Sequence, residues 1–157
     1  MESERYWFAT ADNRRVSLFV CTRLPSGDLH VEQVRTLQNA NEDIHEHHRP
    51  CFLSRGPSAN AALRLASLGH EEEEEHKRFA RVIGDWLGEA TRELRLRRVS
   101  VFAASGLMGL LRDRLDGAAN PLHERELTRL RPDQLARHPA VLNVIFSEMK
   151  QLNTARR

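Results

Sequence analysis

Residues 99–104 read Val-Ser-Val-Phe-Ala-Ala, a short run that is apolar on both of its alternating faces. Such a run is typical of an interior strand whose sheet is covered on both sides. Before it, apolar side chains recur every three or four positions from Phe79 to Leu94, which predicts an amphipathic helix. After it, Ser105-Gly106 predicts a tight turn into a short helix that ends near Gly117. This order of helix, strand and helix indicates an α/β protein.

The helix before this strand is expected to begin near Glu71. Gly69 separates it from a shorter apolar stretch at about 61–68. Glu71–Glu75 would form its first turns, where the positive end of the helix dipole favours acidic side chains. The spacing also predicts ion pairs of Glu73 with Lys77 and of Glu74 with Arg78.

Three runs of alternating residues precede the helix, over about 6–10, 16–21 and 29–37. Turn-forming residues separate them, so they predict an antiparallel meander. The third run changes phase near Gln33, which predicts a β-bulge or a strand end. Residues from about 38 to 60 show no period, and a loop of this length is usually functional or mobile.

The remaining segments complete the expected fold. Residues 122–130 are compatible with a strand or a helix, a brief helical turn is expected at 133–137, and an amphipathic helix at about 140–152. We therefore expect a single α/β domain over residues 1–157. Its mixed five-stranded sheet would begin with the antiparallel meander and be flanked by helices.

Composition excludes several classes of protein. The chain has 157 residues, of which 40% are hydrophobic, enough for one folded core. No apolar run approaches the ~20 residues of a membrane helix, and the early charged residues do not form a secretory signal. Cys21 and Cys51 are expected to be free thiols. We therefore expect a cytoplasmic protein without a membrane partner.

Arginine is distributed unevenly. The formal net charge is only +2, but residues 92–137 hold ten arginines against six acidic residues. Arginine binds phosphate with two parallel hydrogen bonds, so this half could contact RNA; a compositional bias towards arginine explains the same residues without a ligand. The candidates for RNA or ribosome contact, including three in the irregular loop, are His48, Arg49, Arg55, Arg95, Arg97, Arg98, Arg112 and Arg129.

Two other segments are candidate sites. Ser105 and Gly106 start a helix after a buried strand, where free backbone N–H groups bind anions, although a turn capped by serine explains them equally. Asp43, His45, His47 and His48 carry side chains that bind zinc. Their spacing matches no standard ligand pattern, and the alternative is a solvated polar loop.

Four short segments resemble the bacterial host attachment protein family, whose members are similar to the central domain of archaeal and eukaryotic peptide-chain release factors. They are residues 11–19 (Ala-Asp-Asn-Arg-Arg-Val-Ser-Leu-Phe), 75–80 (Glu-His-Lys-Arg-Phe-Ala), 107–112 (Leu-Met-Gly-Leu-Leu-Arg) and 126–130 (Glu-Leu-Thr-Arg-Leu). The resemblance covers about residues 6–138. It implies a ribonuclease H-like sheet, and it favours a strand rather than a helix within 122–130.

The resemblance also implies a function. Release factors carry Gly-Gly-Gln in the loop before their long helix, but residues 54–60 here read Ser-Arg-Gly-Pro-Ser-Ala-Asn. We therefore expect a non-catalytic module without a cofactor that contacts the ribosome or tRNA and not DNA. Two alternatives stay open. One is an indirect role in host or surface attachment, and the other is a metal-dependent hydrolase that uses the loop histidines. Protein partners are not predicted.

Overall fold

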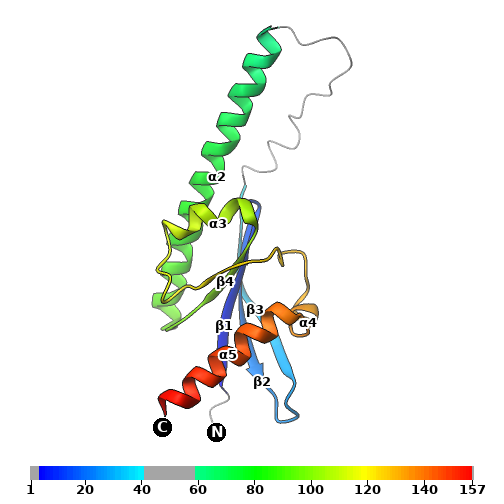
Figure 1. The fold of residues 1–157 in the computed structure, drawn as a ribbon, viewed down its shortest axis with the longest axis vertical. Helices are drawn as coiled ribbons and strands as arrows, with labels where there is room; N and C mark the ends of the chain where they lie inside the picture. The colour runs from blue at the N-terminus through cyan, green and yellow to red at the C-terminus, as the bar shows by residue number, and fades with distance from the viewer. Residues whose placement is uncertain (1–3, 41–58, 157) are drawn as a thin grey trace.

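Strand β1 (Arg5–Ala11) occupies the centre of the sheet in the computed structural model, which describes residues 4–40 and 59–156 (Figure 1). The other strands are β2 (Arg15–Arg23), β3 (Leu29–Gln38), β4 (Ser100–Ala103) and β5 (Leu122–Glu124). The helices are α2 (Ala59–Leu94), α3 (Ser105–Arg112), α4 (Pro132–Leu135) and α5 (Pro139–Ala155). The expected α/β fold with a mixed five-stranded sheet is confirmed.

The strand order is β3-β2-β1-β4-β5. β1, β2 and β3 form the predicted antiparallel meander, whereas β4 pairs with β1 in parallel and β5 pairs with β4 in parallel. Consequently β1, β3, β4 and β5 all run in one direction, and their carboxyl ends lie at the same edge of the sheet.

Each face of the sheet supports its own apolar core. Ala9, Ala11, Val101 and Ala103 pack on one face with α2 and α3. The intervening side chains, such as Phe8 and Phe102, pack on the other face with α4 and α5. This alternation follows from the two-residue period of a strand. It confirms that β4, which is buried at all four positions, is covered on both sides.

A β-bulge in β3 falls where the sequence predicts one. The pairing with β2 shifts between Leu18 and Phe19, which face Arg35 and Gln33, so Val34 is the extra residue. The bulge lets Val31 join the core on the α5 face while Leu37 packs on the α2 face. Val34 itself is 39% exposed.

The long helix differs from the prediction at its beginning. α2 starts at Ala59 and continues through Gly69, so the glutamates lie within the helix instead of opening it. One glycine weakens a helix by only about 1 kcal/mol, which a long helix tolerates. Lys77 pairs with Glu73, as predicted, and also with Glu74. The predicted pair of Glu74 with Arg78 is wrong, because Arg78 pairs with Glu75. The N-terminal half of α2 projects beyond the sheet (Figure 1).

The C-terminus of α2 has an unusual backbone. Arg95 adopts φ = 54°, the left-handed conformation that glycine usually provides after a helix. The N–H of Leu96 donates to the carbonyl of Thr91, and the N–H of Arg95 donates to that of Arg92. These two bonds form a Schellman motif, which ends the helix and turns the chain towards β4.

The segment after β5 also differs from the prediction. The strand expected within 122–130 is present but ends at Glu124; residues 126–130, which resemble the family's closing strand, contain no strand, and 128–129 form a turn. The neighbouring strand β4 ends at Ala103, where α3 leaves the sheet, so no backbone is left for 126–130 to pair with. Pro132 and Pro139 then begin α4 and α5, close to the predicted positions.

Candidate functional site

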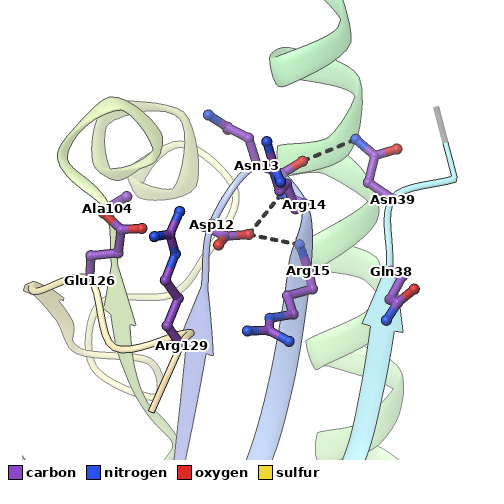
Figure 2. A pocket seen from close by; sticks show the side chains of 9 residues that line it. All are labelled: Asp12, Asn13, Arg14, Arg15, Gln38, Asn39, Ala104, Glu126 and Arg129. Carbon is purple, nitrogen blue, oxygen red and sulfur yellow. Dashed lines mark hydrogen bonds between the residues drawn. The ribbon is translucent and has the colours of Figure 1, made fainter. Parts of the chain in front are cut away.

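A polar pocket of about 490 Å³ opens at the edge of the sheet where β1, β3, β4 and β5 end. In open α/β sheets, ligands bind most often in the crevice outside the carboxyl ends of the strands. We call this cavity the strand-end pocket. Figure 2 shows the residues that line it, which are Asp12, Asn13, Arg14, Arg15, Gln38, Asn39, Ala104, Glu126 and Arg129.

Asp12 organises the floor of the strand-end pocket. Its Oδ1 accepts hydrogen bonds from the backbone N–H of Arg14 (2.7 Å) and of Arg15 (2.8 Å), which forms the tight β1–β2 turn. Its Oδ2 accepts a hydrogen bond from Thr128 Oγ1 at 2.7 Å. The Arg15 guanidinium in turn donates to the carbonyl of Thr128. The carboxylate therefore ties the turn to the segment after β5, and three donors of the protein itself occupy its oxygens.

Asn39 supports the opposite wall. Its backbone N–H donates to the carbonyl of Arg14 at 2.7 Å, and its side-chain Nδ2 donates to the carbonyl of Asn13 at 3.1 Å. Its Oδ1 accepts from Arg78 of α2, which also binds Glu75. Hydrogen bonds thus connect the β1–β2 turn to the end of β3 and to α2, and they fix the position of this wall of the pocket.

The charge of the strand-end pocket is mainly positive. Arg14 and Arg129 are exposed, and Arg15 is half-buried. Within the described residues, no hydrogen bond or ion pair holds the Arg129 side chain. Among the described residues that line the pocket, Asp12 and Glu126 are the acidic ones, and Glu126 is exposed. Since hydrogen bonds occupy both oxygens of Asp12, the exposed Arg129 is available to bind an anion.

The start of α3 borders the same pocket. Ala104 lines it and is the N-cap of α3, and its carbonyl accepts from the N–H groups of Leu107 and Met108. Ser105 and Gly106 are exposed first residues of the helix, whose N–H groups have no acceptor within it. The explanation of Ser105 as the cap is wrong, because the cap is Ala104 and no side chain caps the helix.

The structure separates the predicted RNA contacts. Of the described ones, only Arg129 lines the strand-end pocket. Arg95, Arg97 and Arg98 lie before β4, at the opposite edge of the sheet, and line a second cavity. The seven residues of β1 separate the edges by roughly 20 Å. Arg112 is exposed at the far end of α3. The described arginines among these candidates therefore do not form one continuous surface.

The remaining predicted residues, His48, Arg49, Arg55 and the metal candidates Asp43, His45 and His47, lie outside the described residues. Within 4–40 and 59–156, no three histidine, cysteine or acidic side chains gather as a metal site would require. Cys21 is a buried free thiol, and burial raises its pKa to about 11; Cys51 falls in the segment that is not described.

Sequence reasoning missed most of the strand-end pocket. Local patterns predict only a turn at Asp12 and Asn13 and the beginning of a loop at Gln38, and they assign no site role to Arg14 or Arg15. A signal was present, because Asp12 and Ala104 directly follow β1 and β4, and Glu126 lies two residues after β5. The parallel pairing of β1 with β4, which brings these positions together, was needed to use that signal.

Fold and site together define a class: α/β proteins with a mixed five-stranded sheet and a polar, arginine-lined pocket beyond its parallel strand ends. Residues 7–138 match the family described as "Protein required for attachment to host cells", and the chain belongs to this family. No curated protein matches the chain. No helix within the described ranges has the length and apolarity needed to span a membrane.

Proposed function

We propose that the protein is a non-catalytic binding module that holds RNA phosphates, of tRNA or the ribosome, in the strand-end pocket. The observation that carries this proposal is the convergence of Arg14, Arg15 and Arg129 beside the first turn of α3. Arginine and helix N-termini are both common phosphate ligands. The proposed partners are cytoplasmic, and the resemblance to the central domain of release factors suggests this class of partner.

The hydrogen bonds of Asp12 support a role in binding instead of hydrolysis. A general base needs a carboxylate oxygen that reaches the reacting proton. Both oxygens of Asp12 already accept hydrogen bonds from Arg14, Arg15 and Thr128. The carboxylate therefore shapes the pocket, and the arginines are the groups that face a ligand.

Titration of fluorescently labelled tRNA tests the proposal. Arg129→Gln removes a pocket cation, whereas Arg131→Gln removes an equally exposed charge that is paired with Asp133 outside the pocket. We expect Arg129→Gln to weaken binding by about 1 kcal/mol. The slope of log K against log salt concentration should become less steep by about 1, as expected when one phosphate contact is lost. Arg131→Gln should bind like the wild type.

Co-sedimentation with ribosomes at low salt provides the second measurement. Folded wild-type protein should associate, and Arg129→Gln should associate less than Arg131→Gln. The proposal fails if the wild type binds neither ribosomes nor tRNA, or if both variants lose the same affinity. The latter result would indicate a general charge effect without a site.

A second candidate function is a role in attachment to host cells, and the family description favours it. We propose that such a role is indirect, through surface components that other proteins make or export. A deletion strain should adhere less to host cells, and the wild-type gene should restore adherence. Complementation with the Arg129→Gln variant then decides whether attachment depends on the strand-end pocket. Full restoration by that variant would separate the two functions.

A further inference from the structure

A second cavity, of about 630 Å³, lies at the opposite edge of the sheet from the strand-end pocket. Its walls come from the start of β1, from the chain between α2 and β4, and from the last turns of α5. Figure 1 shows the C-terminal ends of α2 and α5 on this side of the molecule. We call it the terminal groove.

The floor of the terminal groove is apolar. Leu94 and Leu96 are half-buried there, on either side of the left-handed Arg95. Trp7 is also half-buried, and Leu152 of α5 remains 47% exposed. An exposed leucine beside half-buried leucines leaves apolar surface that a ligand can cover, and burial of such surface stabilises complexes.

The rim of the terminal groove is cationic. Arg5, Arg95 and Arg97 are exposed, and in the described part of the chain no acidic side chain pairs with them. Arg98 is different, because it contacts Glu148 at 3.5 Å and donates to Gln151 at 2.9 Å. Glu148, the one acidic residue among the described residues of the groove, is thus occupied by Arg98 and by Ser100. Three cations are left for an anionic partner.

We propose that the terminal groove binds a short acidic amphipathic peptide segment of a partner protein. Its apolar side chains would cover Leu94, Leu96 and Leu152, and its carboxylates would meet Arg5, Arg95 and Arg97. Protein–protein interfaces have an apolar core and a polar rim and are enriched in arginine, and the terminal groove shares this composition. RNA fits less well, because unpaired bases stack on the faces of aromatic or guanidinium groups, whereas this floor offers three leucines and a single half-buried aromatic side chain, Trp7, among the described residues.

The terminal groove and the strand-end pocket are separate sites. Roughly 20 Å of sheet lies between them, and they share no lining residue. A peptide in the groove therefore leaves the pocket open to its own ligand. The protein would then connect an acidic partner protein at one edge of the sheet with an anionic ligand at the other.

Fluorescence anisotropy with labelled peptides of about 14 residues tests the proposal on the full chain. Two probes contain leucine and glutamate. In one, leucine recurs at the spacing of a helix face, and in the other it alternates with glutamate as on a strand. Each probe has two control peptides, one with lysine in place of glutamate and one with serine in place of leucine. We expect an acidic leucine peptide to bind at least about tenfold more tightly than its lysine and serine counterparts, since both contacts contribute. Labelled oligouridine serves as the nucleic-acid probe.

Four variants locate the binding site. Arg97→Glu and Leu152→Asp alter the groove, whereas Arg81→Glu and Leu24→Asp change exposed residues that do not line it. We expect each groove variant to weaken peptide binding by about tenfold, because Leu152→Asp places a charge on the apolar floor and Arg97→Glu sets a like charge against the acidic peptide. The control variants and Arg129→Gln should bind like the wild type. Circular dichroism establishes that each variant is folded.

Several results would overturn the proposal. One is the absence of saturable binding by either acidic probe at up to about 1 mM, the weak end of specific affinities. Another is an equal loss of affinity in the groove variants and their controls. Binding of oligouridine that Arg97→Glu abolishes while no peptide binds would assign the groove to nucleic acid instead.

Discussion

Thr128 Oγ1 donates a hydrogen bond of 2.7 Å to Oδ2 of Asp12, although 116 residues separate the two in the chain. The bond joins the turn after β1 to the segment after β5, beyond the ends of strands that both flank β4. Thr128 is buried, so its hydroxyl depends on Asp12 as a partner. The strand-end pocket therefore depends on a contact between distant parts of the sequence.

The first prediction concerns this pair of residues. Asp12→Ala removes three hydrogen bonds and should lower the free energy of unfolding by about 2–3 kcal/mol, while Thr128→Val removes one and should lower it by about 1 kcal/mol. Urea denaturation measures both. The double variant should be more stable than the sum of the two effects predicts, by about 1 kcal/mol, because the shared bond is lost only once. Strict additivity would show that the bond contributes nothing.

The second prediction concerns the pH dependence of stability. Burial raises the pKa of Glu148, although the hydrogen bond from Ser100 and the charge of Arg98 lower it. The unfolded chain has a pKa of about 4.3 for this group. Because the folded pKa is the higher one, folding favours the protonated acid, and this contribution is lost as pH rises through the folded value. Tyr6 and Cys21 also face the carboxylate, but their raised pKa values keep them neutral in this range.

Glu148→Gln tests this dependence, because glutamine keeps an oxygen that accepts from Ser100 and does not ionise. Relative to the wild type, the variant should gain stability as pH rises from about 4 towards neutrality, above the unfolded pKa. Urea denaturation at a series of pH values gives this difference. A difference that stays constant with pH would mean that the burial of Glu148 does not affect its ionisation.

The third prediction concerns Arg95. A residue with a side chain is strained at φ = 54°, so Arg95→Gly should raise the free energy of unfolding by about 0.5–1 kcal/mol. Arg97→Gly is the matched control. Arg97 is equally exposed but has no positive φ, so glycine there should be destabilising by a few tenths of a kcal/mol or more. If both variants are less stable than the wild type, contacts of the Arg95 side chain stabilise the fold by more than the backbone strain at Arg95 destabilises it.

The fourth prediction compares two glycines of α2. A Cβ at Gly88 would meet nothing within 4 Å, so Gly88→Ala should stabilise the protein by about 0.5–1 kcal/mol through helix propensity. A Cβ at Gly84 would come within 3.1 Å of the Cβ of Arg114. Gly84→Ala should therefore give a smaller gain or a loss. Thermal unfolding measures both, and equal gains would show that the loop around Arg114 moves aside without resistance.

Local patterns predicted most of the elements but not how they meet. The alternation in β1 to β3, the phase change at the bulge and the two-sided burial of β4 could all be recognised from neighbouring residues. The beginning of α2 could not be recognised in this way, because a glycine such as Gly69 is locally typical of a helix boundary. The helix continues through Gly69 because helical residues on both sides propagate it cooperatively. Likewise, the family resemblance favours a strand at 126–130, but these residues lack a partner once α3 has left the sheet.

The candidate site required long-range information. Arg129 could be selected by its residue type, but its place beside Asp12 follows from the parallel pairing of β1 with β4. No local pattern encodes such pairing. The same pairing separates Arg95, Arg97 and Arg98 from Arg129, although all belong to one arginine-rich stretch of sequence. Sequence proximity predicted a continuous basic surface, and the topology divides it between two edges.

The central position of β1 also has a consequence for synthesis of the chain. During translation β1 can pair with β2 as soon as both have emerged, but its other edge pairs with β4, which begins at Ser100. Until then, a nascent chain exposes an open edge with apolar side chains on both faces, the kind of surface that aggregates or recruits chaperones. Truncated chains that end before β4 should therefore be insoluble, because the second edge of β1 stays unpaired in them.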